Sequence, residues 1–202
     1  MNQSSTSKPA RIVAIANQKG GVGKTTTCVN LAAAFSRMKF PVLLIDLDPQ
    51  GNATTGSGID PRRLHMSACE VLLGERTAEE AILRPEGVDY DLLPSNGDLT
   101  AAEISLLQMD RREFALKDAL QPLLSKYAWI FIDCPPSLNM LTLNALGTAN
   151  SVLIPMQCEY YALEGLTGLL NTIEQLRASI NSGLEIEGLL RTMYDGRNNL
   201  AQ

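Results

Sequence analysis

The sequence predicts an α/β protein in which a doubly wound, mostly parallel sheet lies between two layers of helices. Short apolar runs rich in Val, Ile and Leu alternate with longer stretches whose apolar residues recur at helical spacing. Such alternation is typical of the strand and helix units that build a parallel sheet. With 202 residues, 45% of them hydrophobic, the chain is long enough to bury the core of one domain. We therefore expect a single three-layer domain over residues 11–202, preceded by a disordered polar tail over residues 1–10.

The first part of the chain contains a complete strand, helix and strand unit. Residues 11–16 (RIVAIA) form the short apolar run expected of a buried strand. Apolar residues then recur at helical spacing between residues 28 and 38, and Pro41 is expected to stop that helix. Residues 42–45 (VLLI) predict the second strand. The whole is the size of a βαβ unit.

The remaining elements follow from the same two patterns. Helices are expected within residues 66–83, as two short ones around Gly74, and over residues 101–107, 112–125 and 163–176. Strands are expected over residues 88–93, 129–132, 152–154 and 186–193. The leucine-rich stripe of residues 163–176 is expected to face the core rather than a partner.

A glycine-rich loop joins the first strand to the first helix. Residues 18–26 (QKGGVGKTT) are close to the phosphate-binding pattern G-x-x-x-x-G-K-[ST], but Gln18 replaces the first glycine and a second lysine, Lys19, enters the loop. Glycines let backbone amides approach phosphate oxygens, and the start of the helix adds positive potential. The loop therefore predicts a P-loop protein that binds ATP or GTP. Its predicted nucleotide-binding residues are Lys19, Gly20, Gly21, Val22, Gly23, Lys24, Thr25 and Thr26.

The two lysines of this loop have different expected roles. Lys24 is expected to reach the β and γ phosphates, and the Thr25 hydroxyl to bind Mg²⁺. Lys19 lies too early in the loop to approach from the same direction as Lys24. Its ammonium is therefore expected to serve a nucleotide held by a second copy of the chain, which predicts a homodimer bridged by nucleotide.

Two further strand ends carry aspartates. Asp46 and Asp48 follow the second predicted strand, and Asp133 follows residues 129–132. Ligands of open α/β sheets bind at the carboxyl ends of the strands. We assign Asp133 and Asp46, with Thr25, to the Mg²⁺ site, and Asp48 to the attacking water, although Asp46 could also orient that water.

Structural roles are the alternatives for these aspartates. Asp133 could cap a helix that starts near Ser137, and Asp46 or Asp48 could be a solvated loop residue beside Pro49. If the catalytic assignments hold, Lys19, Lys24 and Asp48 act in hydrolysis of the nucleotide, and no serine, histidine or cysteine nucleophile is needed.

Five separated segments carry a family resemblance. They are QKGGVGKTTT, LLIDLDPQGNATTG, WIFIDCPPSL, VLIPMQCEYYALEGL and TMYDGRNNLAQ, and they occur in this order between about residues 11 and 202. Together they resemble the ParA/Soj partition ATPases, within the deviant Walker A group that includes MinD. The resemblance implies ATP rather than GTP, Mg²⁺-dependent hydrolysis, a sandwich dimer formed with ATP, DNA binding without sequence preference, and a ParB-type partner that stimulates hydrolysis.

The same resemblance assigns individual residues. It implies that Lys19 crosses to the phosphates of the other subunit, that Lys24 is the phosphate-loop lysine, that Asp48 positions water, and that Arg197 contacts DNA. It also implies a cytoplasmic protein associated with the bacterial nucleoid. Family members usually continue through another strand and a last helix, so we expect the carboxyl-terminal part of the family fold to be absent from this chain.

Composition limits the other function classes. The formal net charge of −5 argues against a globally basic nucleic-acid binder, so DNA contact would need a local patch with Arg177, Arg191 and Arg197 as candidates. The pairs Arg62-Arg63 and Arg111-Arg112 are expected to be solvated. The four cysteines lack metal-ligand spacing and read as reduced thiols, and His65 is expected at the surface. Apolar runs are too short for a membrane span and the start is unlike a signal peptide.

Two other functions remain open. A MinD-like ATPase that cycles on membranes would need a basic amphipathic helix at its carboxyl end, which this sequence lacks. A truncated, non-hydrolysing nucleotide-binding module is the other. An iron-sulfur reductase is disfavoured because Cys134 lies between Asp133 and two prolines.

Overall fold

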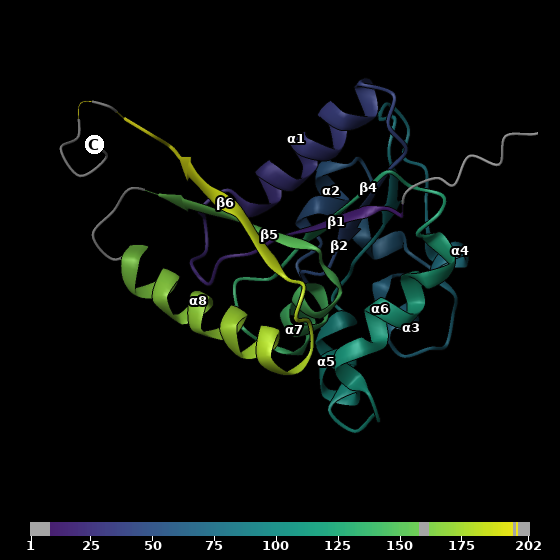
Figure 1. The fold of residues 1–202 in the computed structure, drawn as a ribbon. Helices are drawn as coiled ribbons and strands as arrows, with labels where there is room; N and C mark the ends of the chain where they lie inside the picture. Colours follow the sequence, from purple (N-terminus) through teal and green to yellow (C-terminus); the bar gives the residue numbers. More distant parts are fainter. Residues whose placement is uncertain (1–8, 158–161, 196, 198–202) are drawn as a thin grey trace, which may run out of the picture.

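A six-stranded parallel sheet forms the centre of the computed structural model, which describes residues 9–157, 162–195 and 197 (Figure 1). The order of its strands is β3-β2-β4-β1-β5-β6. Every neighbouring pair in this order is parallel. The strands are β1 (Arg11–Ile15), β2 (Val42–Asp46), β3 (Asp91–Leu93), β4 (Trp129–Asp133), β5 (Ser151–Gln157) and β6 (Glu185–Thr192).

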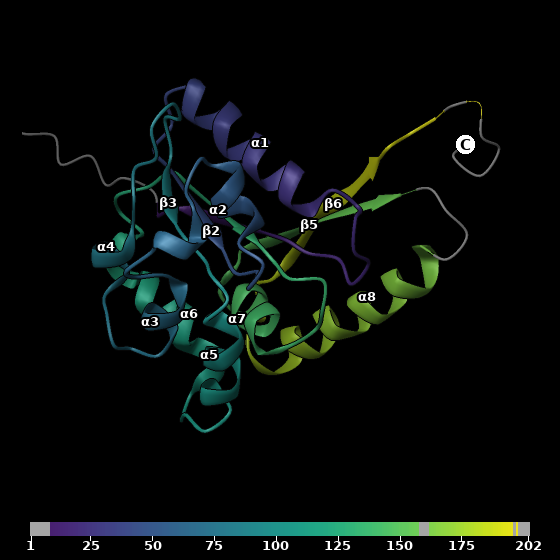
Figure 2. The ribbon, with the colours of Figure 1, turned by 180° about the vertical axis from the view of Figure 1, so that it is seen from behind.

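Helices cover both faces of the sheet, so the predicted three-layer, doubly wound α/β class is confirmed (Figures 1 and 2). On one face lie α1 (Lys24–Arg37) and α2 (Asn52–Gly56). The other face carries α3 (Ala68–Leu72), α4 (Ala78–Ala81), α5 (Leu99–Leu106), α6 (Ala115–Leu120), α7 (Met140–Thr148) and α8 (Ala162–Ser179). Three 3₁₀ turns complete the described elements: η1 (Pro61–Arg63), η2 (Arg112–Phe114) and η3 (Gln121–Leu123).

The two cores follow from the alternation of side chains along each strand. Ile12 and Ala14 of β1 pack into the larger core, whereas Val13 and Ile15 pack against α1 on the opposite face. Because helices cover both faces, the central strands are apolar throughout rather than alternating with polar residues. The leucine-rich stripe behaves as predicted where it is described, since Leu169, Ile173 and Leu176 of α8 are buried in the larger core.

Register brings three strand ends to one place. Asp46, the last residue of β2, pairs with Asp133, the last residue of β4, and Asp133 pairs on its other side with Ile15 of β1. The loop after β1 therefore begins beside both aspartates. The strand ends that the sequence predicted to meet do meet.

α1 ends at Arg37, within one residue of the predicted helical stretch and before Pro41, and Lys39 between them takes a left-handed φ of 68°. Other predicted boundaries are wrong. The strand predicted over 88–93 is only Asp91–Leu93. The helix predicted over 112–125 is divided into η2, α6 and η3, with Pro122, which has no N–H to donate, in η3.

The predicted disordered tail of residues 1–10 is wrong for Ala10. Ala10 is buried, and its N–H donates to the Leu124 carbonyl at 2.8 Å. Residues 1–8 lie outside the described residues. Among the helices that the structure describes, none is long and apolar enough to cross a membrane.

Candidate nucleotide-binding site

The loop between β1 and α1 has the backbone geometry of a phosphate cradle. Gly21 and Gly23 take left-handed φ angles of 74° and 88°, which other residues adopt only with strain. A Cβ added at Gly20 or Gly21 would meet no atom within 4 Å, so this side of the loop is open. α1 begins at Lys24 directly after the loop, and its first N–H groups have no partner within the helix. The loop therefore presents backbone donors to an open space, as an anion site requires.

That open space is a pocket of about 490 Å³, within the range of small-molecule sites. Four segments line it: the loop and start of α1, the segment after β2, the segment after β4, and the residue after β6. The lining residues are Gly20, Gly21, Gly23, Lys24, Thr25, Thr26, Asp48, Gln50, Asn52, Pro136 and Met193. Most of the residues predicted to bind nucleotide thus share one cavity, but Lys19 and the buried Val22 are not among its lining residues.

Lys24 is a buried cation at the floor of this pocket. The residue is 7% exposed, and its Nζ donates to the Lys19 carbonyl at 3.1 Å. Burial lowers the pKa of Lys24, while the nearby Asp133, Cys134 and Asp48 raise it. Removal from water costs this ammonium solvation that a single carbonyl does not replace. A polyanion in the pocket would supply the missing interaction.

Asp133 is a buried carboxylate without a hydrogen bond. Both of its oxygens are buried, and neither has a partner among the described residues. Burial raises the pKa of Asp133 to about 7; the Thr25 hydroxyl and Lys24 lower it, and Asp46 and Asp48 raise it. The Thr25 hydroxyl is close enough to affect this pKa without the geometry of a full hydrogen bond. A cation beside Thr25 and Asp133 would resolve this cost, so the residues present fit Mg²⁺.

Asp46 is held differently, although it pairs with Asp133 across the sheet. One carboxylate oxygen accepts bonds of 2.8 Å from both the N–H and the hydroxyl of Thr54, and the other accepts from the Asp48 N–H at 3.1 Å. Burial raises the pKa of Asp46 to about 6, and the bonds from Thr54 and Asp48 lower it. Both carboxylate oxygens of Asp46 thus accept hydrogen bonds within the protein, and Asp46 supports the loop that carries Asp48.

Asp48 occupies the edge of the pocket on a tightly braced loop. One of its carboxylate oxygens accepts from the Gln50 N–H at 3.0 Å, and its carbonyl accepts from the Ser95 hydroxyl at 2.6 Å. The Ser95 N–H in turn donates to the Thr54 hydroxyl oxygen at 2.9 Å. Thr54 and Ser95 therefore fix the position of Asp48 relative to Asp46. Neither was predicted from the sequence, although Ser95 follows β3 and so lies at a strand end like the aspartates.

The capping alternative for Asp133 is wrong. α7 begins at Met140, and its cap is Asn139, whose side chain accepts from the Thr142 N–H at 3.1 Å. The solvated-loop alternative is likewise wrong for Asp46 and Asp48, which are 0% and 7% exposed.

Asn17 and Thr192 anchor the phosphate loop and were also missed. The Asn17 amide donates to the Pro155 carbonyl of β5 at 2.7 Å, while its oxygen accepts from the Lys19 N–H at 3.0 Å. Thr192, the last residue of β6, donates its hydroxyl to the Val22 carbonyl at 2.8 Å. Asn17 could have been noted as a polar residue that ends an apolar run, but nothing in the sequence joins Thr192 to a loop about 170 residues away.

The arginines predicted near DNA have different surroundings. Arg197 is 91% exposed on its side chain and pairs with Asp195 at 2.7 Å, which lowers the pKa of Asp195. Arg191 lies 4.9 Å from the ring centre of Tyr194. Arg177 donates to the Leu184 carbonyl at 2.6 Å and so fixes the turn between α8 and β6.

The other single residues are as predicted, with one outside the described part. Arg62 and Arg63 are 88% exposed on their side chains, Arg111 is exposed and Arg112 is partly so, and His65 is at the surface. Cys28, Cys69 and Cys134 are buried free thiols. Cys158 lies outside the described residues.

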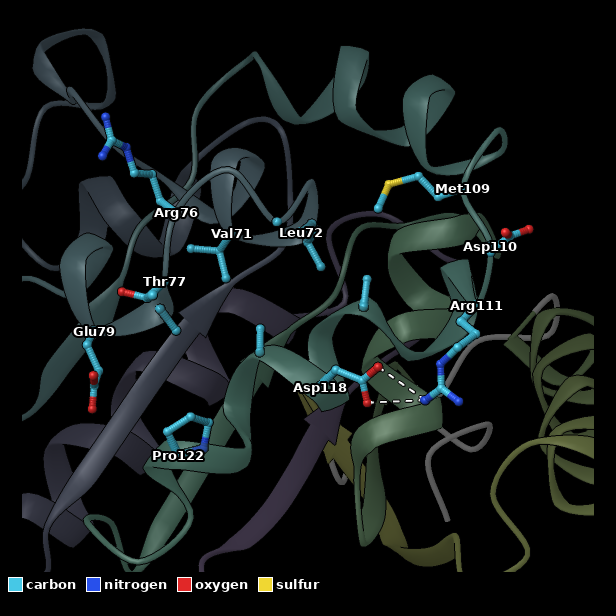
Figure 3. Close-up of a pocket in the computed structure, with 14 residues that line it drawn as sticks. Val71, Leu72, Arg76, Thr77, Glu79, Met109, Asp110, Arg111, Asp118 and Pro122 are labelled. Atoms are coloured by element: carbon cyan, nitrogen blue, oxygen red, sulfur yellow. Dashed lines mark hydrogen bonds and ion pairs between the residues drawn. The ribbon is translucent and has the colours of Figure 1, made fainter.

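A second hollow lies away from the loop, among α3, α4 and α6 (Figure 3). It encloses about 450 Å³ between apolar residues such as Val71, Leu72 and Met109. Arg111 and Asp118 form an ion pair of 3.2 Å at its rim. None of the predicted site residues lines it, so it is not part of the nucleotide site.

The fold and the site together define a P-loop nucleotide-binding protein of the doubly wound α/β class. Comparison with known proteins agrees: the chain matches the AAA domain family over residues 10–186. It is 52% identical to the chromosome partitioning protein ParA of Myxococcus xanthus, over 95% of this chain and 68% of that protein. It is 48% identical to the sporulation initiation inhibitor protein Soj of Bacillus subtilis, over 94% of this chain and 75% of that protein.

A solved structure is similarly close. The cobyrinic acid a,c-diamide synthase of Mycobacterium smegmatis, crystallised with ADP and magnesium, is 45% identical and superimposes with a TM-score of 0.91, over 95% of this chain and 78% of that one. With these relatives, the chain belongs to the ParA/Soj family of partition ATPases.

Proposed function

We propose that this chain is a Mg²⁺-dependent ATPase switch that dimerises around ATP, binds DNA without sequence preference and segregates chromosomal or plasmid DNA with a ParB-type partner protein. The observation that carries the proposal is the pocket lined by the glycine loop and buried Lys24, together with the buried Asp133 carboxylate, which is close enough to Lys24 to affect its pKa and has no hydrogen bond among the described residues. The partition names of relatives about half identical to this chain support the biological role. A cytoplasmic, nucleoid-associated location is part of the same proposal.

The residues of the pocket divide the chemistry among them. Lys24 would neutralise the β and γ phosphates, and Thr25 with Asp133 would hold Mg²⁺, which would supply further positive charge beside them. Asp48, fixed by Gln50 and Ser95 at the pocket edge, would orient the attacking water. We assign Asp46 to holding the Asp48 loop through Thr54 rather than to direct contact with the metal, because its carboxylate oxygens already accept three hydrogen bonds.

Lys19 is the residue that would join two subunits. Its N–H is held by Asn17 and its carbonyl by Lys24, so its backbone is fixed while its side chain is only partly buried. We propose that its ammonium reaches the phosphates bound by a second copy. The nucleotide would then bind the dimer better than the monomer, and hydrolysis would reverse the assembly.

Size-exclusion chromatography with ATP and Mg²⁺ tests the switch. Asp48→Ala is expected to form a stable dimer, because ATP binds but is not consumed, whereas Lys19→Ala is expected to remain a monomer. The dimer fraction is measured by light scattering, with Lys39→Ala as the control for loss of an exposed lysine. Monomer for both variants, with wild-type protein also monomeric, would contradict the proposed dimer.

Arg197→Ala tests the proposed DNA contact. Its exposed guanidinium has only the exposed Asp195 as an ionic partner among the described residues, so DNA phosphates can compete for it. We expect weaker binding on every duplex sequence, and the slope of log K against log salt to fall by about one unit. Affinity is measured by fluorescence anisotropy over a salt series, and Arg63→Ala, at an equally exposed arginine, serves as the control. An unchanged salt slope for Arg197→Ala would remove this residue from the interface.

A further inference from the structure

The end of β6 touches the phosphate loop at two points. The Thr192 hydroxyl donates to the Val22 carbonyl at 2.8 Å. The Thr192 methyl carbon lies 3.5 Å from the position that a Cβ on Gly23 would take. Both contacts fall on the same peptide unit, the one that joins Val22 to Gly23, and β6 is the strand at the far edge of the sheet from β3. The loop is thus held by a segment that is distant in sequence.

The geometry of a peptide unit gives this contact a consequence. In a trans peptide the carbonyl of one residue and the N–H of the next lie in one plane and point in opposite directions. The structure contains no cis peptide bonds among the described residues. A bond that fixes the Val22 carbonyl therefore also fixes the direction of the Gly23 N–H. The Val22 carbonyl is occupied by Thr192, Val22 is buried and Gly23 lines the pocket, which leaves the N–H side of this unit for the space for phosphate.

Because Gly23 is flexible, the orientation of the peptide before it has to be fixed by a contact from another part of the chain. Gly23 has a φ of 88°, and a glycine at this position can rotate into several other conformations at little cost. Nothing in its own side chain fixes the peptide that precedes it. Thr192 itself is held by strand pairing to β5, where it lies opposite Gln157. The next residue, Met193, lines the pocket.

We propose that Thr192 is a positioning residue of the phosphate loop, which aims the Gly23 N–H at the nucleotide phosphates by fixing the Val22 carbonyl. The inference rests on the proposed function, because it assumes that the pocket takes a nucleotide. Thr192 does not touch the phosphates itself. Its contribution is preorganisation: the donor is in place before the ligand arrives, so less conformational entropy is lost on binding.

Two variants separate the hydroxyl from the shape of the side chain. Thr192→Val keeps the branched shape and removes the donor, whereas Thr192→Ser keeps the donor. With ADP and Mg²⁺ as the probe, titration calorimetry is expected to show about 3- to 10-fold weaker binding for Thr192→Val, the range of one net hydrogen bond. Thr192→Ser is expected to bind like wild type. Thr148→Val, which removes a buried hydroxyl bonded to the Asn144 carbonyl of α7, is the matched control.

A spectroscopic signal reports on the peptide itself. Val22-Gly23 is the only Val-Gly dipeptide in the chain, so labelling valine carbonyl carbon and glycine nitrogen gives one resolved amide signal. In wild-type protein the Gly23 amide proton is expected to shift downfield on addition of ADP and Mg²⁺. The shift is expected to shrink in Thr192→Val and to return in Thr192→Ser. A purely structural role would change stability without changing this signal.

The outcomes separate this inference from the proposed function. Wild-type affinity together with a wild-type Gly23 shift in Thr192→Val would overturn the role of Thr192 and leave nucleotide binding intact. Wild-type protein that bound neither ADP nor ATP would overturn both. If Thr192→Val did not fold, Thr192→Ala would take its place with the same two measurements and the same expected results.

Discussion

Lys24→Met is expected to weaken ATP binding by roughly 100-fold or more while leaving the folded protein at least as stable as wild type. The ammonium is buried at the pocket floor, with one carbonyl as its hydrogen-bond partner among the described residues, so the protein holds this charge at a cost that a bound polyanion would offset. Methionine fills the volume of the lysine stem without the charge. The measurement is calorimetric titration with ATP and Mg²⁺, together with urea unfolding of the free protein.

The sign of the effect on stability follows from the pKa. Burial lowers the pKa of Lys24, so at neutral pH the unfolded chain binds its proton more tightly than the folded protein does. Loss of this charge therefore does not destabilise the fold. Lys126→Met is the matched control, because Lys126 is exposed and pairs with Glu79. A Lys24→Met variant that bound ATP as wild type does would show that the pocket is not the nucleotide site.

The architecture was predictable from local sequence patterns and from the geometry of a parallel sheet. Apolar runs of strand length and apolar residues at helical spacing specify elements, and in a parallel sheet the ends of the strands must meet at one edge. That is why Asp46, Asp133 and the loop after β1 could be placed together before any coordinates. The boundaries were less predictable: β3 covers only Asp91–Leu93 of the stretch 88–93, and the stretch 112–125 is divided into η2, α6 and η3.

The division of roles among the aspartates was not predictable from the sequence. Asp46 and Asp133 pair directly across the sheet and both end apolar strands, so their sequence contexts are alike. They differ because Thr54 lies near Asp46 and satisfies it, whereas no described group completes a hydrogen bond to Asp133. Which carboxylate remains available to a ligand is decided by tertiary contacts. The same holds for Ser95 and Thr192, which reach the site from strands far along the chain.

Buried charge without a partner is costly, and here it is concentrated at one site. Lys24 and Asp133 influence each other electrostatically, yet the Lys24 ammonium bonds to the Lys19 carbonyl and the Asp133 oxygens bond to no described group. A direct ion pair would stabilise the free protein and compete with the ligand. Keeping the two groups apart leaves Lys24 for phosphate and Asp133 for metal. The free protein is less stable as a result, and the free energy of ligand binding is correspondingly more favourable.

Asp133→Asn is expected to stabilise the free protein at neutral pH and to abolish the Mg²⁺ dependence of nucleotide binding. Burial raises the pKa of Asp133 from 3.8 to about 7, so the folded state retains a proton that the unfolded state releases. The free energy of unfolding of wild type should therefore fall as the pH rises from about 4 to about 7. Asparagine does not titrate, so the variant should lack this part of the fall, by roughly 1–3 kcal/mol at pH 8.

Urea unfolding at pH 5, 6, 7 and 8 measures this difference. Asp46, whose pKa burial raises to about 6, contributes a fall of the same sign at lower pH in both proteins, so the interval from pH 6 to 8 isolates Asp133. Asp91→Asn is the control, because Asp91 does not line the nucleotide pocket and accepts a bond from the Tyr127 hydroxyl at 2.8 Å. Addition of ATP and Mg²⁺ should reverse the order, since the ligand stabilises wild type more than Asp133→Asn. Equal stability of wild type and Asp133→Asn at every pH would mean that the carboxylate is solvated in the folded protein and is not held in reserve for a metal.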